Sequence, residues 1–224
     1  MELIRRIGKE PKTFTYSDCR LERRGFLSIF SFAVSGRAGR FDLMDRGHAV
    51  VVMPVDLRKR EIIMIEQPRH AKAFTPPAPG AETLGRAKAD GASTDSFTLD
   101  AKDVTLFELP AGMIDPGETP AQAASRELRE ETGIIVAPEA LRKVAEYHPS
   151  IGGSTERMTA FIAELPDPVD MGGADGDGNE QIAVWRMSFE EAWRQMETRR
   201  IETASSMILL RELKIMDLAA KTRP

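Results

Sequence analysis

A capped helix with a strongly acidic side is predicted between Thr119 and Gly133. Thr119 is a favourable N-cap, a proline follows it at the first helical position, and Gln122 stands three residues later as in a capping box. Gly133 supplies a common C-terminal stop. An apolar stripe at helical spacing, turned away from the carboxylates, consists of Ala121, Ala124 and Leu128. The segment therefore predicts one side that packs and one that is wet and acidic.

The acidic side carries Glu127, Glu130 and Glu131, which are spaced so that a helix places them on one face. Like charges at this spacing repel by about 0.2–0.5 kcal/mol per pair, so a cation is expected beside them. Mg²⁺ is the natural candidate, because it takes hard oxygen ligands and bridges one or two carboxylates to substrate phosphates. The residues do not distinguish Mg²⁺ from Mn²⁺.

Composition sets further bounds on the protein. With 224 residues, 42% of them hydrophobic, the chain can bury a sizeable core as one domain or as a domain with a small appendage. The net charge of −4 indicates no nucleic-acid partner. The sequence shows no signal-peptide core or membrane span, so we expect no membrane association and a cytoplasmic location. Cys19, the single cysteine, excludes an internal disulfide and is expected to be an inert buried thiol.

Apolar and β-branched segments predict a sheet with two or three helices. The predicted strands are residues 26–34, 48–55, 61–67, 104–112, 158–165 and 181–188. Ser188 and Thr203 are expected to cap two further helices. Residues 71–103 contain few large apolar side chains and are too long for an ordinary connection, which predicts a mobile loop or insertion. This segment is interpreted either as a lid or as a tolerated surface insertion.

The acidic helix and its approach carry a recognisable family motif. They match the Nudix box, G-x5-E-x7-R-E-U-x-E-E-x-G-U with U an apolar residue, at every specified position. The matching residues are Gly112, Glu118, Arg126, Glu127, Leu128, Glu130, Glu131, Gly133 and Ile134. The probability that the whole pattern arises by chance in a chain of this length is on the order of one in a million. The chain therefore resembles a Nudix hydrolase rather than a protein with an ordinary solvated acidic helix.

The resemblance implies an α+β architecture, the Nudix fold, in which a mixed β-sheet is sandwiched between helices. An N-terminal β-strand region is expected over residues 1–45, where it would pair two subunits of a homodimer. Residues 46–224 would form the Nudix hydrolase domain, with the long insertion near residues 71–103. The apolar alternation of the early strands fits an ordinary extension of the sheet equally well.

Metal ligands follow from the same resemblance. In this family the first and last glutamates of the R-E-U-x-E-E run bind the cation, the middle one assists, and a main-chain carbonyl before the box glycine often completes the site. These roles fall on Ala111, Glu127, Glu130 and Glu131 here. Arg126 is expected to orient the carboxylates through charge-assisted hydrogen bonds. Glu118 is either a structural partner of Arg126 or an auxiliary ligand.

Segments outside the box resemble the ADP-ribose pyrophosphatase branch, among them RGHAVVVMPVD, IEQPR, ELPAGMIDPGE and HPSIGGSTER. Arg69 matches a position that contacts the substrate diphosphate in relatives, and Arg46 and Glu66 are weaker candidates for substrate contacts. Relatives carry a catalytic base before the NExI strand, where this chain has Gly178. Glu180 is the first candidate to replace it. The alternatives are Asp175, Asp177, Glu130 and Glu131.

The resemblance and the acidic helix together predict an enzyme, a Nudix pyrophosphohydrolase. We expect Mg²⁺-dependent hydrolysis of a nucleoside diphosphate sugar, with ADP-ribose yielding AMP and ribose 5-phosphate as the leading case. GDP-mannose or another nucleotide sugar is the alternative substrate. A non-catalytic nucleotide-binding regulator is the alternative from another class. The sequence leaves the preferred base and sugar open.

Overall fold

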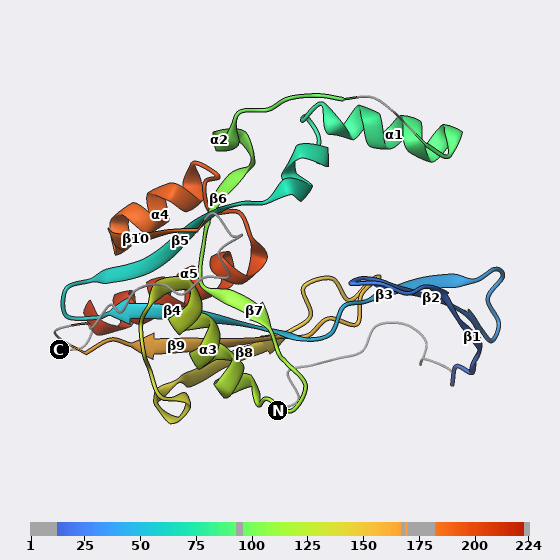
Figure 1. Ribbon diagram of the computed structural model, residues 1–224. Coiled ribbons are helices and arrows are strands. Elements are labelled where there is room, and N and C mark those ends of the chain that lie inside the picture. Colours follow the sequence, from blue (N-terminus) through green and yellow to red (C-terminus); the bar gives the residue numbers. More distant parts are fainter. Residues whose placement is uncertain (1–12, 93–95, 167–168, 170–181, 222–224) are drawn as a thin grey trace, which may run out of the picture. The chain divides into compact units, whose positions relative to one another are not determined.

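The computed structural model describes residues 13–92, 96–166, 169 and 182–221 (Figure 1). The chain divides into two compact units. The first comprises Met1–Gly47 with Ser150–Glu156, and the second comprises His48–Pro149 with Arg157–Pro224. Within the described part of the chain, no helix has both the length and the apolar character needed to cross a bilayer.

The first unit is a three-stranded antiparallel sheet. Its strands are β1 (Tyr16–Arg23), β2 (Ser28–Val34) and β3 (Phe41–Asp45), paired in chain order. Across one face, the ring centroids of Tyr16 and Phe32 are 6.0 Å apart, and those of Phe32 and Phe41 are 5.9 Å apart. All eight residues of β1 are exposed. The expectation of a buried thiol was therefore wrong, because Cys19 lies in this exposed strand and is itself exposed.

The second unit contains a mixed sheet in the order β10-β5-β4-β9-β8. These strands are β10 (Ala183–Ser188), β5 (Glu61–Pro68), β4 (Ala49–Asp56), β9 (Met158–Glu164) and β8 (Arg142–Tyr147). Two short strands also join it: β6 (Thr105–Glu108) pairs with β5, and β7 (Ala111–Met113) pairs with β4. The pairing of β4 with β9 is parallel, whereas the other pairings are antiparallel.

Helices cover both faces of this sheet (Figure 1). Alternate residues of a strand point to opposite faces, and β4 shows the consequence. Val50 and Val52 pack in one cluster with α3 (Pro120–Thr132). Val51 and Met53 pack in the other cluster, with α4 (Phe189–Glu197) and α5 (Ala204–Lys221). The predicted α+β arrangement, a mixed sheet between helices, is confirmed.

The predicted strand over residues 104–112 forms two strands rather than one. It breaks at Leu109 and Pro110, between β6 and β7. A proline cannot donate to a ladder of main-chain hydrogen bonds, which explains why pairing changes partner there. The carbonyl of Pro110 still accepts a hydrogen bond from Val52 N at 2.8 Å. The break sends β7 to β4, where it leads into the acidic helix.

The segment after β5 is more ordered than its composition predicted. It forms the short helix η1 (His70–Phe74), the helix α1 (Gly80–Asp90) and the single turn α2 (Ala101–Val104). Phe74 and Phe97 meet edge to face at 5.6 Å, and both lie so close to Gly80 that an added Cβ atom would collide with them. The expectation of a loop was therefore wrong for residues 80–90, which form a helix whose start is packed against two aromatic side chains, whereas the insertion stays a prediction.

Candidate active site

The acidic helix α3 begins and ends as its sequence predicted. Thr119 N donates to Gln122 Oε1 at 2.9 Å, and Gln122 N donates to Thr119 Oγ1 at 3.3 Å, which completes the capping box. At the other end Gly133 adopts a left-handed conformation with φ of 75°, and its N–H bonds to Arg129 O at 2.8 Å. Leu128 is fully buried against the sheet. Packing of the buried side of α3 against the sheet sets the rotation of the helix, and therefore determines which of its side chains face β7.

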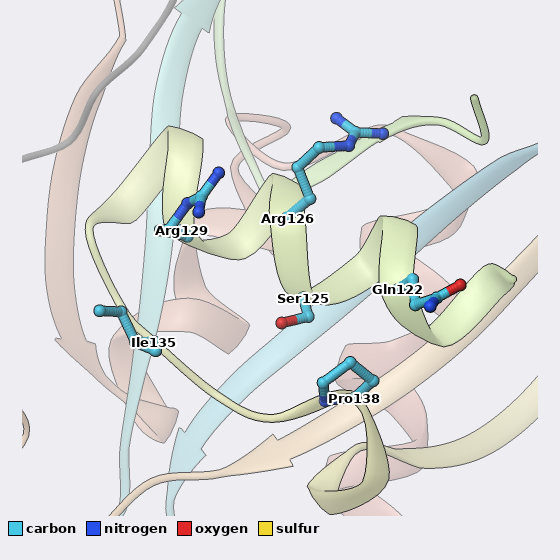
Figure 2. A pocket seen from close by; sticks show the side chains of 6 residues that line it. All are labelled: Gln122, Ser125, Arg126, Arg129, Ile135 and Pro138. Atoms are coloured by element: carbon cyan, nitrogen blue, oxygen red, sulfur yellow. The ribbon is translucent and has the colours of Figure 1, made fainter. Parts of the chain in front are cut away.

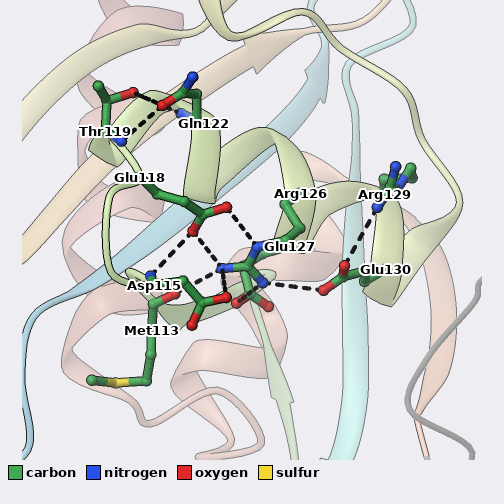
Figure 3. Close-up of polar contacts among 9 residues, drawn as sticks. All are labelled: Met113, Asp115, Glu118, Thr119, Gln122, Arg126, Glu127, Arg129 and Glu130. Carbon is green, nitrogen blue, oxygen red and sulfur yellow. Dashed lines mark hydrogen bonds and ion pairs between the residues drawn. The ribbon is translucent and has the colours of Figure 1, made fainter.

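Arg126 is the centre of the polar network on this helix (Figure 3). Its Nε and Nη2 each donate to Glu118 at 2.9 Å, and Nη2 also donates to Met113 O at 2.9 Å. Its Nη1 donates to Glu127 Oε1 at 2.8 Å and to Glu130 Oε2 at 3.1 Å. Hydrogen bonding to Glu118, followed by that to Glu127, raises the pKa of Arg126 above its usual value. The guanidinium therefore stays charged and holds the carboxylates of Glu118, Glu127 and Glu130 in fixed orientations. Its contact with Glu118 is bidentate.

Two of the glutamates pack closely against β7. Glu131 is only 6% exposed, and its Oε2 accepts a hydrogen bond from Ala111 N at 2.9 Å. The carboxylate of Glu127 lies where a Cβ atom on Gly112 would be, so glycine is required at that position. The side chain of Glu130 is more open, at 36% exposed. The prediction of a wet acidic side was thus wrong for Glu131, because the β7 backbone covers it.

The oxygen donors on α3 and β7 are of the chemical type that a hard divalent cation binds. Mg²⁺ takes one or two carboxylates and fills its remaining positions with water and phosphate oxygens. Across the described residues, no group of three or more His, Cys, Asp or Glu side chains is close enough together to hold a metal ion by itself. The assignment of Ala111, Glu127, Glu130 and Glu131 as ligands therefore stays a prediction.

The structure separates the predicted substrate-binding residues. Arg69 follows β5 and pairs with Glu108 of β6, whose carboxylate is buried. Glu66 stands opposite Phe107 in the β5–β6 register, and its Oε1 accepts from Arg200 Nη2 at 2.6 Å. Phe107 packs in the cluster beneath α4 and α5, so Glu66 lies on the face of the sheet opposite α3.

Of the other predicted positions, Arg46 belongs to the first unit, and Glu180 is not among the described residues. The Nε of Arg46 is 3.5 Å from Glu156 Oε1 and its guanidinium lies 5.8 Å from the ring centroid of Phe26. Glu180 lies outside the described residues, as do Gly178, Asp177 and Asp175.

Glu108 and Arg200, the partners of Arg69 and Glu66, were not predicted from the sequence. A signal was present for Glu108, because it is a charged residue in a predicted strand, between the apolar residues Phe107 and Leu109. A buried charge needs a partner.

A shallow cavity of about 270 Å³ lies beside α3 (Figure 2). Its lining residues are Gln122, Ser125, Arg126, Arg129, Ile135 and Pro138. Figure 2 shows the Arg126 guanidinium directed away from Ser125 and Pro138. Ser125 Oγ donates to Val136 O at 2.5 Å, which ties the helix to the segment after it. None of Glu127, Glu130 and Glu131 lines this cavity, which borders the carboxylate cluster through Arg126.

Comparison with known proteins identifies the family. The NUDIX domain model matches residues 94–207. The ADP-ribose pyrophosphatase of Escherichia coli strain K12 is 32% identical over 184 residues, which cover 81% of this chain and 75% of that protein. The chain belongs to the Nudix family. The expectation of a Nudix pyrophosphohydrolase is thereby confirmed.

Other relatives of this Nudix protein extend the comparison. The GDP-mannose pyrophosphatase of Cronobacter sakazakii is 30% identical over 174 residues, covering 78% of this chain and 77% of that protein. A solved structure described as an ADP compounds hydrolase superposes with a TM-score of 0.68, at 17% identity, covering 97% of this chain and all of that one. That likeness confirms the Nudix fold. Members of the family generally need a divalent cation.

The Glu118–Arg126 pair predicts how the stability of this Nudix protein depends on pH. Hydrogen bonding to Arg126 lowers the pKa of Glu118 below its usual 4.5. Because the folded-state pKa is the lower one, the stabilisation is present above pH 4.5 and is lost as the pH falls through the folded-state value. Glu118→Gln should therefore lower the melting temperature at pH 7 by about 2–4 °C. The difference from wild type should narrow below pH 4.5 in thermal unfolding monitored by circular dichroism, and a constant difference would contradict the assignment.

Proposed function

We propose that this Nudix protein hydrolyses the diphosphate linkage of a nucleoside diphosphate sugar with Mg²⁺ as its cation. ADP-ribose, split into AMP and ribose 5-phosphate, is the leading substrate. The observation that carries the proposal is the carboxylate cluster of α3, which Arg126 holds in place beside β7. The names of relatives that match most of the chain supply the substrate class.

Arg126 and β7 position the residues that are proposed to bind the cation. Arg126 fixes Glu127 and Glu130, and β7 fixes Glu131 through Ala111 N. Glu127, Glu130, Glu131 and the Ala111 carbonyl would hold the cation. When bound, that cation neutralises phosphate oxygens and lowers the pKa of water. Ordering these side chains before substrate arrives lowers the entropic cost of reaching the transition state.

Proton transfer and substrate contacts complete the proposal. Glu180 takes the proton of the attacking water, with Glu130 as the alternative base. Arg69 contacts the substrate diphosphate, and Arg46 is a second contact. Glu66, which is bonded to Arg200, is proposed as a substrate contact on resemblance alone.

We further propose that the protein is a cytoplasmic homodimer joined through the sheet of its first unit. Support for that interface is the exposure of Tyr16 and Leu21 on β1 and of Phe26 beside it. Exposed apolar side chains of this size on one small sheet are typical of interaction surfaces.

A panel of substrates tests the function. ADP-ribose, GDP-mannose, ADP-glucose and a nucleoside triphosphate are incubated with the protein and Mg²⁺, and the products are separated by chromatography. We expect kcat/KM for ADP-ribose to exceed that for each other substrate by about tenfold or more. AMP and ribose 5-phosphate should form in equal amounts. A preference for GDP-mannose, in line with the Cronobacter relative, would replace ADP-ribose as the substrate. Binding without cleavage of any panel member would favour the regulator.

Gly112→Ala should lower kcat for the preferred substrate by about 10–100-fold, because the new methyl group displaces the Glu127 carboxylate. The matched control is Gly85→Ala, since a Cβ atom at Gly85 meets nothing within 4 Å. It should leave kcat within about twofold of wild type, as surface substitutions away from a site usually do. Steady-state kinetics on both variants, with melting curves to verify folding, measures the difference. Equal activity in the two variants would show that Glu127 does not need its observed position.

A further inference from the structure

We propose that Glu108 is a positioning residue that holds Arg69 for contact with the substrate diphosphate, an inference that rests on the proposed function. Glu108 is buried, at 3% exposed, and stands at the end of β6. Arg69 Nε donates to both of its carboxylate oxygens at 2.9 Å, and Arg69 Nη2 also bonds to Oε2. The amide of Gln67 donates to the same Oε2 at 3.3 Å. The carboxylate is therefore bonded on both oxygens and cannot turn without losing several contacts.

The register of the sheet places Glu108 on the same face as α3. Glu108 stands opposite Ile65 of β5, and partners in register share a face. Ile63, two residues before Ile65, packs in the cluster that contains Leu128 of α3. Residues two apart in a strand point to the same face, so Glu108 also faces the α3 side. Arg69 is thereby bonded on the face that carries the carboxylate cluster.

The path along the chain from Glu108 to the carboxylate cluster is short. Gly112 of β7 follows Glu108 by four residues and stands opposite Val50 of β4. The Glu127 carboxylate packs so closely against Gly112 that an added Cβ atom would overlap it. Four residues of extended chain span at most about 14 Å. This short connection, with Glu108 on the α3 face, supports a site in which one nucleoside diphosphate contacts both Arg69 and the carboxylates.

The two ends of the pair have different surroundings. The Glu108 side chain is 4% exposed, whereas that of Arg69 is 43% exposed. A buried ion pair often adds little net stability, because taking both charges out of water costs about as much as their attraction returns. Its specific effect is to fix the direction of the guanidinium, and Arg69 N also donates to Val104 O at 2.7 Å, which fixes the backbone. The Arg69 side chain is therefore ordered when the protein folds, so substrate binding does not carry the entropic cost of ordering it.

Steady-state kinetics with ADP-ribose and Mg²⁺ tests this role. Glu108→Gln keeps the shape but removes the charge, and should raise KM about tenfold while kcat stays within about threefold. Arg69→Gln should raise KM at least as much. Because Glu108 acts through Arg69, the double variant Arg69→Gln/Glu108→Gln should match Arg69→Gln within about twofold. The matched control is Glu61→Gln, which breaks a Glu61–Arg186 pair of 3.0 Å at the other end of β5 and should leave KM unchanged.

Each outcome decides the matter. An unchanged KM in Glu108→Gln, or additive effects in the double variant, overturns the positioning role while the proposed function stands. Absence of cleavage and of binding for every panel member by the wild-type protein overturns both. Melting curves establish that each variant is folded. Should the glutamine variant not fold, Glu108→Asp keeps the charge but draws it back by one methylene, and it must raise KM for the inference to hold.

Discussion

Glu127→Gln is expected to lower kcat by about 10³-fold or more, the effect of removing a charged ligand from a catalytic cation. Glutamine has the same shape as glutamate but lacks the negative charge. Arg126 keeps its bonds to Glu118, Glu130 and Met113 O in this variant, so the network should survive. Steady-state kinetics with the preferred substrate at saturating Mg²⁺ measures the loss.

The control for this variant is Glu197→Gln, at an exposed glutamate that ends α4. It makes the same chemical change on the surface of another helix, so kcat should stay within about twofold of wild type. Melting temperatures of both variants should lie close to wild type. Retention of more than a tenth of the wild-type kcat in Glu127→Gln would remove this carboxylate from the proposed ligand set.

Removal of divalent cations is expected to abolish hydrolysis, with a decrease of at least about 10³-fold. Added Mg²⁺ should restore the rate, and Mn²⁺ tested in parallel would show which cation supports the higher kcat. A second readout does not depend on turnover. Mg²⁺ that binds the folded protein should raise its melting temperature as its concentration passes the dissociation constant. That increase should be smaller in Glu127→Gln. Full activity in excess chelator would contradict a metal-dependent mechanism.

The local features of α3 were predictable because their causes lie within a few residues. Thr119, Gln122 and Gly133 set the ends of the helix through contacts three or four positions apart. The alternation of β4 between two helical layers follows from its continuous apolar sequence, which is typical of a strand buried on both faces. The carboxylate cluster was likewise recognisable from spacing and from the family motif.

Other features depend on partners distant in the sequence, and spacing does not reveal these. Glu108 and Arg69 are 39 residues apart, so the strand pattern showed an unexplained charge but not its partner. The bonds of Glu118 to Arg126 support its structural role, whereas its role as an auxiliary ligand stays a prediction. The burial of Glu131 depends on β7, whose separation from β6 follows from a change of pairing partner at Pro110.

The parallel pairing of β4 with β9 has a consequence for synthesis of the protein. Ala49 pairs with Met158, so the central strand must wait for about a hundred further residues before this neighbour leaves the ribosome. During that interval a strand whose every residue is buried in the finished fold presents apolar side chains to other nascent chains. Such non-local pairing slows folding and exposes intermediates to aggregation. Expression at low temperature or with added chaperones should therefore increase the yield of native protein.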